Sequence, residues 1–150
     1  MSLNLQKSNL VNAILPHVAF DGWSQVSFDQ AVNDLRMSPS LAAAVAPRGA
    51  VDLAVTFHRT GDKEMVAAYN AADTGSFNIR SKVTLAVRLR LETIKDKEVV
   101  RRGSSLFALP NFAADGAKLI WETADHIWNA LGDTSSDVNW YTKRVTLGTC

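Results

Sequence analysis

The chain has 150 residues, of which 47% are hydrophobic and 21% are charged, a composition typical of one globular domain with a real core. The net charge of +1 provides no global attraction to nucleic acid or anionic membranes, so any such preference must be local. The single cysteine, Cys150, excludes an intrachain disulfide, and no apolar run is long enough to span a bilayer. The first residues lack the features of a signal or transit peptide. We therefore expect a cytoplasmic protein from a bacterium.

Helix signals dominate the first part of the chain. Apolar residues at helical spacing predict a helix over residues 5–18. Ser27 is the expected N-cap of a second helix over 28–37. Ser38 and Pro39 then predict the N-cap and first residue of a short third helix that extends to residue 45.

A longer helix is expected from Ala50, and the Thr-Gly-Asp-Lys sequence at 60–63 could bend or break it. Segment 82–92 alternates apolar and polar residues as a strand would, but no comparable strand exists elsewhere to pair with it. A helix is therefore favoured there, with apolar residues on two sides, and such a helix belongs inside a bundle. Its first apolar side comprises Ile79, Val83, Val87, Leu91 and Ile94, and the opposite side comprises Leu85 and Leu89.

Pro110 predicts the start of another helix, which Gly132 is expected to end. Trp121 and Trp128 flank Asp125 at the edge of its apolar stripe. That stripe comprises Phe112, Leu119, Ile120, Thr123, Ala124, Ile127 and Leu131. A last helix, capped by Ser135 or Ser136, is expected through residue 147. The predicted fold class is all-α, with a head over 1–60 and a helical body over 61–150.

Short helices followed by a long fourth one resemble the helix-turn-helix head of TetR-type transcriptional regulators. The charges of residues 1–60 argue against DNA binding, because four cations and four anions cancel there. The candidate recognition helix, PSLAAAVA, also lacks the side chains that contact bases and phosphates. We therefore expect no nucleic-acid partner.

Catalytic and metal-binding patterns are missing from the sequence. His17, His58 and His126 are isolated, and neither a CxxC nor an HExxH motif occurs. His126 is expected to pair with Glu122 on the helix surface. We predict neither an enzyme site, nor a metal site, nor a cofactor.

Two features point to binding. Eight Lys or Arg and three Asp or Glu lie between Arg80 and Arg102, which indicates either a solvated helix face with its exit loop or a patch for anionic lipid head groups. Arg90 falls within an apolar face, so it should pair or extend its head group to water. In the last helix, an aromatic and charged face forms either core or a hot spot for a partner protein: Asp137, Trp140, Tyr141 and Arg144.

At these residues the chain resembles the Coq-nine family of lipid-binding accessory proteins in ubiquinone biosynthesis. The matching sequences are PRGAVDL (47–53), VRLRLE (87–92), ALPN (108–111), DHIW (125–128) and GDTSSDVNWYTKR (132–144). The resemblance implies a TetR-like fold, usually dimeric, that does not regulate transcription. It implies a pocket for polyprenylated quinone precursors, which the protein presents to a di-iron demethoxyubiquinone hydroxylase. The family continues beyond this point with further helices, one of them amphipathic and thought to touch the membrane.

We therefore interpret the chain as a non-catalytic lipid-binding protein. We expect it in the cytoplasm, peripheral to the inner membrane, and we expect eukaryotic relatives in the mitochondrial matrix. Its rival is a TetR-type ligand-responsive regulator. The expected partner-binding residues are Asp125, Trp128, Asp137, Trp140, Tyr141 and Arg144. The expected lipid-binding residues are Phe57, Val83, Val87, Leu91, Leu106, Phe112, Leu119, Ile120 and Ile127.

Overall fold

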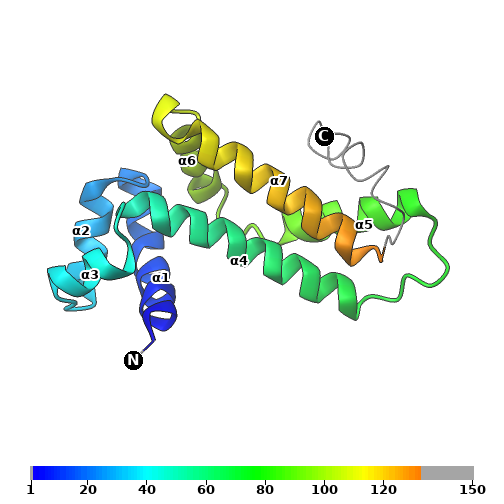
Figure 1. Ribbon diagram of the computed structural model, residues 1–150, viewed down its shortest axis with the longest axis horizontal. Coiled ribbons are helices and arrows are strands. Elements are labelled where there is room, and N and C mark those ends of the chain that lie inside the picture. The colour runs from blue at the N-terminus through cyan, green and yellow to red at the C-terminus, as the bar shows by residue number, and fades with distance from the viewer. Residues whose placement is uncertain (1, 133–150) are drawn as a thin grey trace. The chain divides into compact units, whose positions relative to one another are not determined.

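A computed structural model describes residues 2–132, and helices are the only regular elements in that range (Figure 1). The prediction of an all-α fold is confirmed. The chain forms two compact units. The first comprises Met1–His58 with Asp96–Ala113, and the second comprises Arg59–Lys95 with Ala114–Cys150. Residues 96–113, which the sequence analysis assigned to the body, thus fold with the N-terminal head.

The elements follow one another along the chain with short connections. The helices are α1 (Leu3–Asp21), α2 (Gln25–Asp34), α3 (Pro39–Val45), α4 (Ala50–Ala71), α5 (Ile79–Glu92), α6 (Lys97–Phe107), the 3-10 helix η1 (Pro110–Phe112) and α7 (Ala113–Ala130).

The second helix begins one turn earlier than the sequence indicates. Ser24, not Ser27, is the N-cap of α2, because its hydroxyl accepts a hydrogen bond from the Ser27 backbone N–H at 3.2 Å. The Ser27 side chain is fully buried and donates to the Gly22 carbonyl at 2.6 Å. The prediction placed the cap at Ser27 because both serines precede apolar residues at helical spacing. The predicted cap at Ser38 and the first residue at Pro39 are confirmed for α3.

The first unit has a mainly aliphatic core in which α1 packs on α2, α3 and α6. Its fully buried side chains include Leu10, Ile14 and Leu53. Trp23 joins the elements of this unit, since its indole N–H donates to the Val99 carbonyl at 3.3 Å and its ring lies 5.7 Å from that of Phe57. Burial of apolar surface therefore holds this unit together.

Helix α6 lies where the sequence analysis predicted an exit loop. Asp96 caps it by accepting a hydrogen bond from the Glu98 N–H at 2.9 Å, and Val99 faces the core. The sequence does carry this cap and an apolar spacing of seven from Val99 to Leu106. Gly103 argued against a helix in the sequence, because glycine is a poor helix former. Trp23 lies beside this glycine, with its Nε1 at 3.6 Å from where a Cβ would stand, an ordinary van der Waals contact.

Helix α4 runs without a break from Ala50 to Ala71, so the predicted bend or break at 60–63 is wrong. A glycine inside a helix costs about 1 kcal/mol relative to alanine, which tertiary contacts can offset. No single helix in the described part of the chain is both long and apolar enough to cross a membrane. Helices α3 and α4 pass that test together, but they are bent by 49°.

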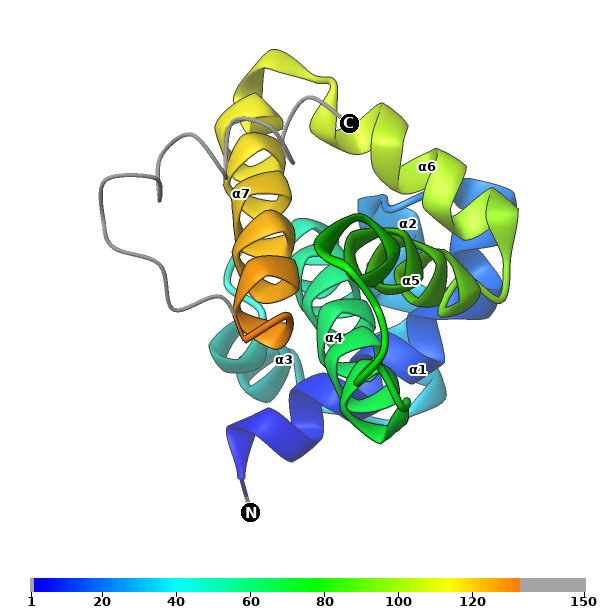
Figure 2. The same ribbon diagram turned by 90° about the vertical axis from the view of Figure 1, so that its right-hand side faces the viewer.

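The second unit packs α5 and α7 alongside its part of α4, as Figures 1 and 2 both show. The helical interpretation of 82–92 is confirmed, but only one apolar side of α5 is covered. Leu85 and Ala86 are buried, whereas Val87 and Leu91 are exposed. The second-unit core comprises Met65, Tyr69, Leu85, Ala86, Ile127 and Leu131.

Helix α7 closes the described part of the chain. A 3-10 turn from Pro110 precedes it, and Gly132 follows it with a φ of +72°, a backbone conformation that favours glycine. The predicted start and end of this helix are thus confirmed. Ile120 is exposed, although it was assigned to the buried stripe. Helical periodicity fixes the direction of a side chain but not whether another residue packs against it.

Candidate functional site

The predicted partner surface lies partly on α7. Trp121, Asp125 and Trp128 follow one another at spacings of four and three, and all three side chains are half-buried. Trp128 packs against the second-unit core. The predicted residues Asp137, Trp140, Tyr141 and Arg144 lie outside the described residues.

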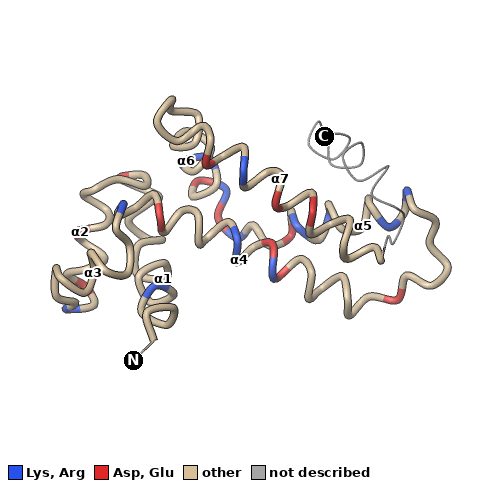
Figure 3. Tube along the Cα trace, in the orientation of Figure 1, with Lys and Arg blue, Asp and Glu red and all other residues tan. Residues whose placement is uncertain are grey.

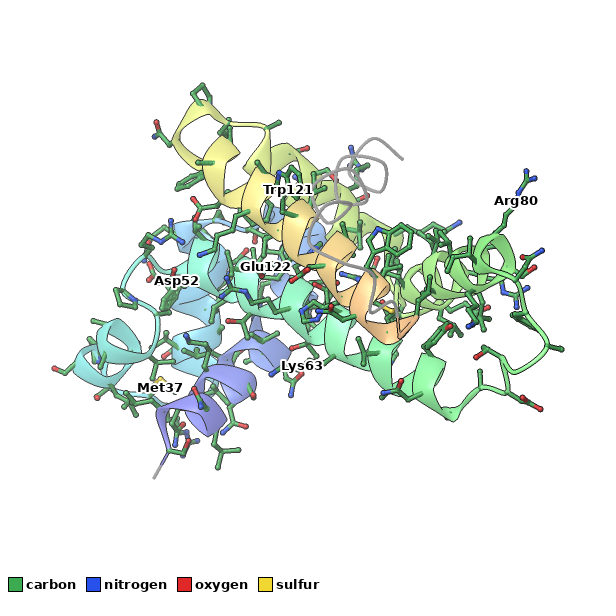
Figure 4. The ribbon with its side chains drawn as sticks, turned by 45° about the vertical axis from the view of Figure 1, so that its right-hand side comes forward. Met37, Asp52, Lys63, Arg80, Trp121 and Glu122 are labelled. Carbon is green, nitrogen blue, oxygen red and sulfur yellow. The ribbon has the colours of Figure 1, made fainter. Side chains whose placement is uncertain are left out.

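An ion pair between α4 and α7 lies on the same helix as these tryptophans. The Arg59 guanidinium donates from Nε and Nη2 to the two carboxylate oxygens of Glu122, at 2.9 and 3.0 Å. These hydrogen bonds lower the pKa of the Glu122 carboxyl and raise the pKa of Arg59. Figure 4 shows Glu122 on the side of α7 that faces α4. Glu122 is therefore hydrogen-bonded to Arg59, 63 residues away, while the predicted partner His126 contributes a smaller Coulombic attraction that also lowers the pKa of Glu122.

A buried polar cluster joins the three helices of the second unit. We call it the Asp62 cluster, and it comprises Asp62, Arg90, Thr93 and Thr123. The Asp62 side chain is fully buried on α4 and accepts a hydrogen bond from Arg90 Nε of α5 at 2.8 Å. Thr123 Oγ1 of α7 lies 2.8 and 3.0 Å from the two carboxylate oxygens. Arg90 Nη1 donates to Thr93 Oγ1 at 2.9 Å. The prediction that Arg90 would pair or extend its head group to water is confirmed by this ion pair.

Gly61 makes room for this cluster. A Cβ atom at position 61 would stand 2.7 Å from Cζ of Arg90, closer than non-bonded atoms pack. The guanidinium that fills the space is held by Asp62, the next residue. The glycine that suggested a helix break is therefore explained by the close approach of α5 to α4.

The predicted lipid-binding residues lie in different settings. Phe57 and Leu106 pack against the first-unit core, while Val83 and Ile127 belong to or pack against the second-unit core. Leu119 is buried and Phe112 is half-buried. The exposed members are Val87, Leu91 and Ile120. Phe57, Leu106 and Phe112 belong to the first unit, and the other six residues belong to the second.

Sequence reasoning missed the members of the Asp62 cluster other than Arg90. A carboxylate at position 62 beside a glycine is typical of a turn, and Thr123 is a common residue of helices. One signal was available, because an arginine in an apolar face needs an anion within reach when its head group does not extend to water. The sequence does not say which of its acidic residues supplies that anion. Within residues 2–132, no group of three or more His, Cys, Asp or Glu side chains is arranged to hold a metal ion.

Comparison with known proteins identifies the sequences that this chain resembles. The COQ9 family model matches residues 113–150, which include α7. The chain is 27% identical over 150 residues to the probable ubiquinone biosynthesis protein coq9, mitochondrial, of Dictyostelium discoideum, covering 94% of this chain and 48% of that protein. It is 26% identical to the COQ9 protein of Drosophila melanogaster over 95% of this chain and 45% of that protein.

The ubiquinone biosynthesis protein COQ9 of Rattus norvegicus is 24% identical, over 92% of this chain and 46% of that protein. The names of all three relatives assign those proteins to mitochondria. The chain spans about half the length of the curated relatives it matches. Over nearly its whole length, the chain is therefore similar to COQ9 proteins of ubiquinone biosynthesis, which confirms the resemblance seen in the sequence.

Proposed function

We propose that this protein acts in ubiquinone biosynthesis as a non-catalytic, lipid-binding accessory protein. In this role it presents a polyprenylated quinone precursor to the di-iron hydroxylase of the pathway. The observation that carries the proposal is the similarity to COQ9 proteins over 94% of the chain. The family model adds α7 and the predicted aromatic face that follows it.

Exposed apolar side chains support the lipid-binding part of the proposal. Helix α5 carries apolar residues on two sides, and its outer side leaves Val87 and Leu91 exposed. Ile120 of α7 is also exposed. Apolar surface that stays in contact with water is available to bind an isoprenoid tail, because its burial is favourable by about 25 cal/mol per Å2.

The partner-binding part of the proposal rests on α7. Tryptophan is enriched at the centre of protein interfaces, and Trp121 and Trp128 are half-buried on one side of this helix. The Arg59–Glu122 pair and the Thr123–Asp62 hydrogen bond join α7 to α4 one residue apart along α7. A helix held at such points can present its aromatic side chains in one orientation, which lowers the entropic cost of binding.

Lipid extraction tests the first part. The purified protein, expressed in a quinone-producing host, is extracted with organic solvent and the extract is analysed by mass spectrometry. We expect a stoichiometric polyprenylated quinone or phenol. Val87→Ser with Leu91→Ser should reduce its yield, while Leu3→Ser with Leu5→Ser, two exposed residues at the start of α1, should not. Extracts without isoprenoid species would contradict lipid binding.

Co-purification with the di-iron hydroxylase tests the second part. Trp128→Lys and Trp140→Lys should each abolish capture of the hydroxylase without loss of helical content measured by circular dichroism. Asn129→Lys, an exposed neighbour of Trp128, is the matched control and should bind normally. If Trp140→Lys unfolds the protein, that tryptophan is a core residue. Undiminished capture by both folded variants would exclude this surface.

The rival function, a TetR-type transcriptional regulator, is tested by gel shift with DNA at low salt. A regulator must show a shift that weakens as salt rises, because phosphate contacts release counterions. We expect no such shift, because positive and negative side chains balance in residues 1–60.

A further inference from the structure

Tyr69 on α4 is a buried tyrosine whose hydroxyl group has no hydrogen-bonding partner among the described residues. Its side chain is 5% exposed and belongs to the second-unit core. The backbone carbonyl of Tyr69 accepts a hydrogen bond from the Ala72 N–H at 3.0 Å, but within residues 2–132 its phenolic oxygen neither donates nor accepts one. Burial without a partner costs a hydroxyl group the hydrogen bonds that it makes in water, so such a group in a native protein requires an explanation.

Three other buried polar groups of the described chain are paired, which sets this tyrosine apart. The Ser27 hydroxyl donates to the Gly22 carbonyl at 2.6 Å, and the Trp23 indole N–H donates to the Val99 carbonyl at 3.3 Å. The carboxylate at the centre of the Asp62 cluster accepts hydrogen bonds from two neighbouring helices. The missing partner is therefore specific to this position, where a bound ligand would supply it.

The surroundings of Tyr69 on α4 are uncharged. Asp62, Met65 and Tyr69 follow one another at spacings of three and four, so they share one side of the helix, and all three are buried. Tyr69 lies about 10 Å along the helix axis from Asp62, so the Asp62 cluster and the Tyr69 hydroxyl are separate polar groups of one apolar core. Residues 65–71 of α4 include no charged residue, and Figure 3 shows none in the last turns of this helix. A charged ligand group would find no counterion on this part of α4.

The chemistry of the site selects an uncharged ligand that carries an oxygen atom. A tyrosine hydroxyl donates one hydrogen bond and accepts others, so a carbonyl, ether or hydroxyl oxygen can pair with it. A carboxylate or phosphate group would lose its hydration here without a cation to offset that loss. Met65 lies on the same side of α4, and the flexible thioether of methionine adapts to the shape of an apolar ligand. A quinone or phenol ring with oxygen substituents meets both requirements.

We propose that the Tyr69 hydroxyl donates a hydrogen bond to an oxygen atom on the ring of the bound quinone precursor. The ring then lies against the second-unit core, and Tyr69 distinguishes an oxygenated ring from an isoprenoid hydrocarbon. This inference rests on the proposed function, because it assumes a quinone-type lipid, and it adds the residue that recognises the polar end of that lipid. Tyr69 is absent from the lipid-binding residues that the sequence analysis predicts, all of which are apolar.

Two probes that differ in their ring oxygens test the proposal. The first is the ubiquinone with two isoprene units, and the second is geranylbenzene, which has the same tail on a ring without oxygen. Equilibrium dialysis measures the dissociation constant of each probe for the unsubstituted chain and for Tyr69→Phe, which removes only the hydroxyl group. We expect Tyr69→Phe to weaken binding of the ubiquinone about fivefold, the effect of one lost hydrogen bond, and to leave binding of geranylbenzene unchanged.

Thr123→Val is the matched control, because it removes a hydroxyl group of the same unit that has a partner, the Asp62 carboxylate at 2.8 Å. It should lower the midpoint of thermal unfolding of the ligand-free protein and change the dissociation constants of the two probes by the same factor. Tyr69→Phe should leave that midpoint unchanged or raise it, because no hydrogen bond within the protein is lost. The two variants thus separate ligand recognition from structural damage.

Three results would overturn the inference alone. In the first, Tyr69→Phe binds the ubiquinone as tightly as the unsubstituted chain does. In the second, it weakens binding of both probes by the same factor, which assigns the tyrosine to packing. In the third, it lowers the unfolding midpoint as Thr123→Val does, which shows that the hydroxyl is already paired in the ligand-free protein, for example with a water molecule. If the unsubstituted chain binds neither probe, the proposed lipid binding itself is wrong, and this inference with it.

Discussion

The two compact units bury side chains of different chemistry. In the first, the buried residues are apolar apart from Ser27, and Leu10, Ile14 and Leu53 have almost no contact with water. In the second, a full ion pair lies among the helices, because Asp62 is entirely buried and Arg90 is 17% exposed. Both units leave apolar side chains in water, for example Phe20 in the first and Leu91 in the second. The difference between the units is therefore the buried ion pair of the second.

Apolar burial and the buried ion pair have different roles, because the first stabilises a unit and the second orients its helices. Apolar burial stabilises without strong directional preference, so the first unit depends mainly on packing. A buried ion pair contributes little net stability, because desolvation offsets its attraction, but its hydrogen bonds require one geometry. The Asp62 cluster fixes α5 against α4 and α7 in this way. It thereby determines which side of α5 faces outward.

The largest expected effect is the loss of one partner of the buried ion pair. Asp62→Ala leaves the Arg90 guanidinium buried beside α4 without its carboxylate, and we expect the free energy of unfolding to fall by about 3–5 kcal/mol. Urea unfolding followed by circular dichroism measures it. Ile14→Ala in the first unit should cost a similar 2–5 kcal/mol, but by creating a cavity.

Replacing both charged partners separates the stability that the ion pair itself provides from the cost of leaving one buried charge without its partner. Asp62→Leu with Arg90→Met removes the charges together and keeps apolar volume, so it should recover most of the lost stability. If the double variant is as unstable as Asp62→Ala, the ion pair itself stabilises the second unit. Its main role would then be stability and not the orientation of the helices.

Helices and their ends could be predicted from the sequence where they depend on local signals alone. The cap at Ser38, the proline at position 39 and the glycine at 132 each mark a helix end through their own backbone preferences, and the structure confirms them. Helix 79–92 could be predicted because no strand was available to pair with it. The aromatic and acidic residues of α7 were also correctly placed on a helix.

Long-range contacts account for what the sequence did not predict. Gly61 lies inside a helix where Arg90, which is distant in sequence, comes too close for a Cβ. Asp62 and Thr123 are 61 residues apart, and no local pattern joins them. Which side of α5 faces water likewise depends on α4 and α7. Periodicity gave two apolar sides, and only the packing of other helices selects between them.

A smaller effect is expected at Gly61, where helix propensity and packing oppose each other. Gly61→Ala gains about 1 kcal/mol of helix propensity but places a Cβ 2.7 Å from the Arg90 guanidinium. We expect a net loss of about 1–2 kcal/mol, because Asp62 holds that group in place. In an Arg90→Ala background the same substitution should stabilise the protein. Additive effects in a double-mutant cycle would show that the side chain of Arg90 moves aside freely.

The smallest expected effect is at the partly exposed ion pair between Arg59 and Glu122. Hydrogen bonds from Arg59 lower the pKa of the Glu122 carboxyl in the folded state, so the pair stabilises the protein above the unfolded pKa of about 4.3. This contribution is lost as the pH falls through the lowered folded pKa. Because Arg59 is 46% exposed, solvent screening limits it to about 0.5–1 kcal/mol at neutral pH.

Glu122→Gln should therefore lower the free energy of unfolding at pH 7, and the difference from the unsubstituted protein should vanish near about pH 2. Glu98→Gln is the matched control in the first unit, because Arg101 also lowers the pKa of Glu98, but both residues lie on the surface of α6. Its effect should be smaller, since the two partners of Glu98, Arg101 and Arg102, lie on the same helix as Glu98. If the two variants lose the same stability, the Arg59–Glu122 pair does not hold α7 to α4. The orientation of α7 would then depend on the Asp62 cluster and on apolar packing alone.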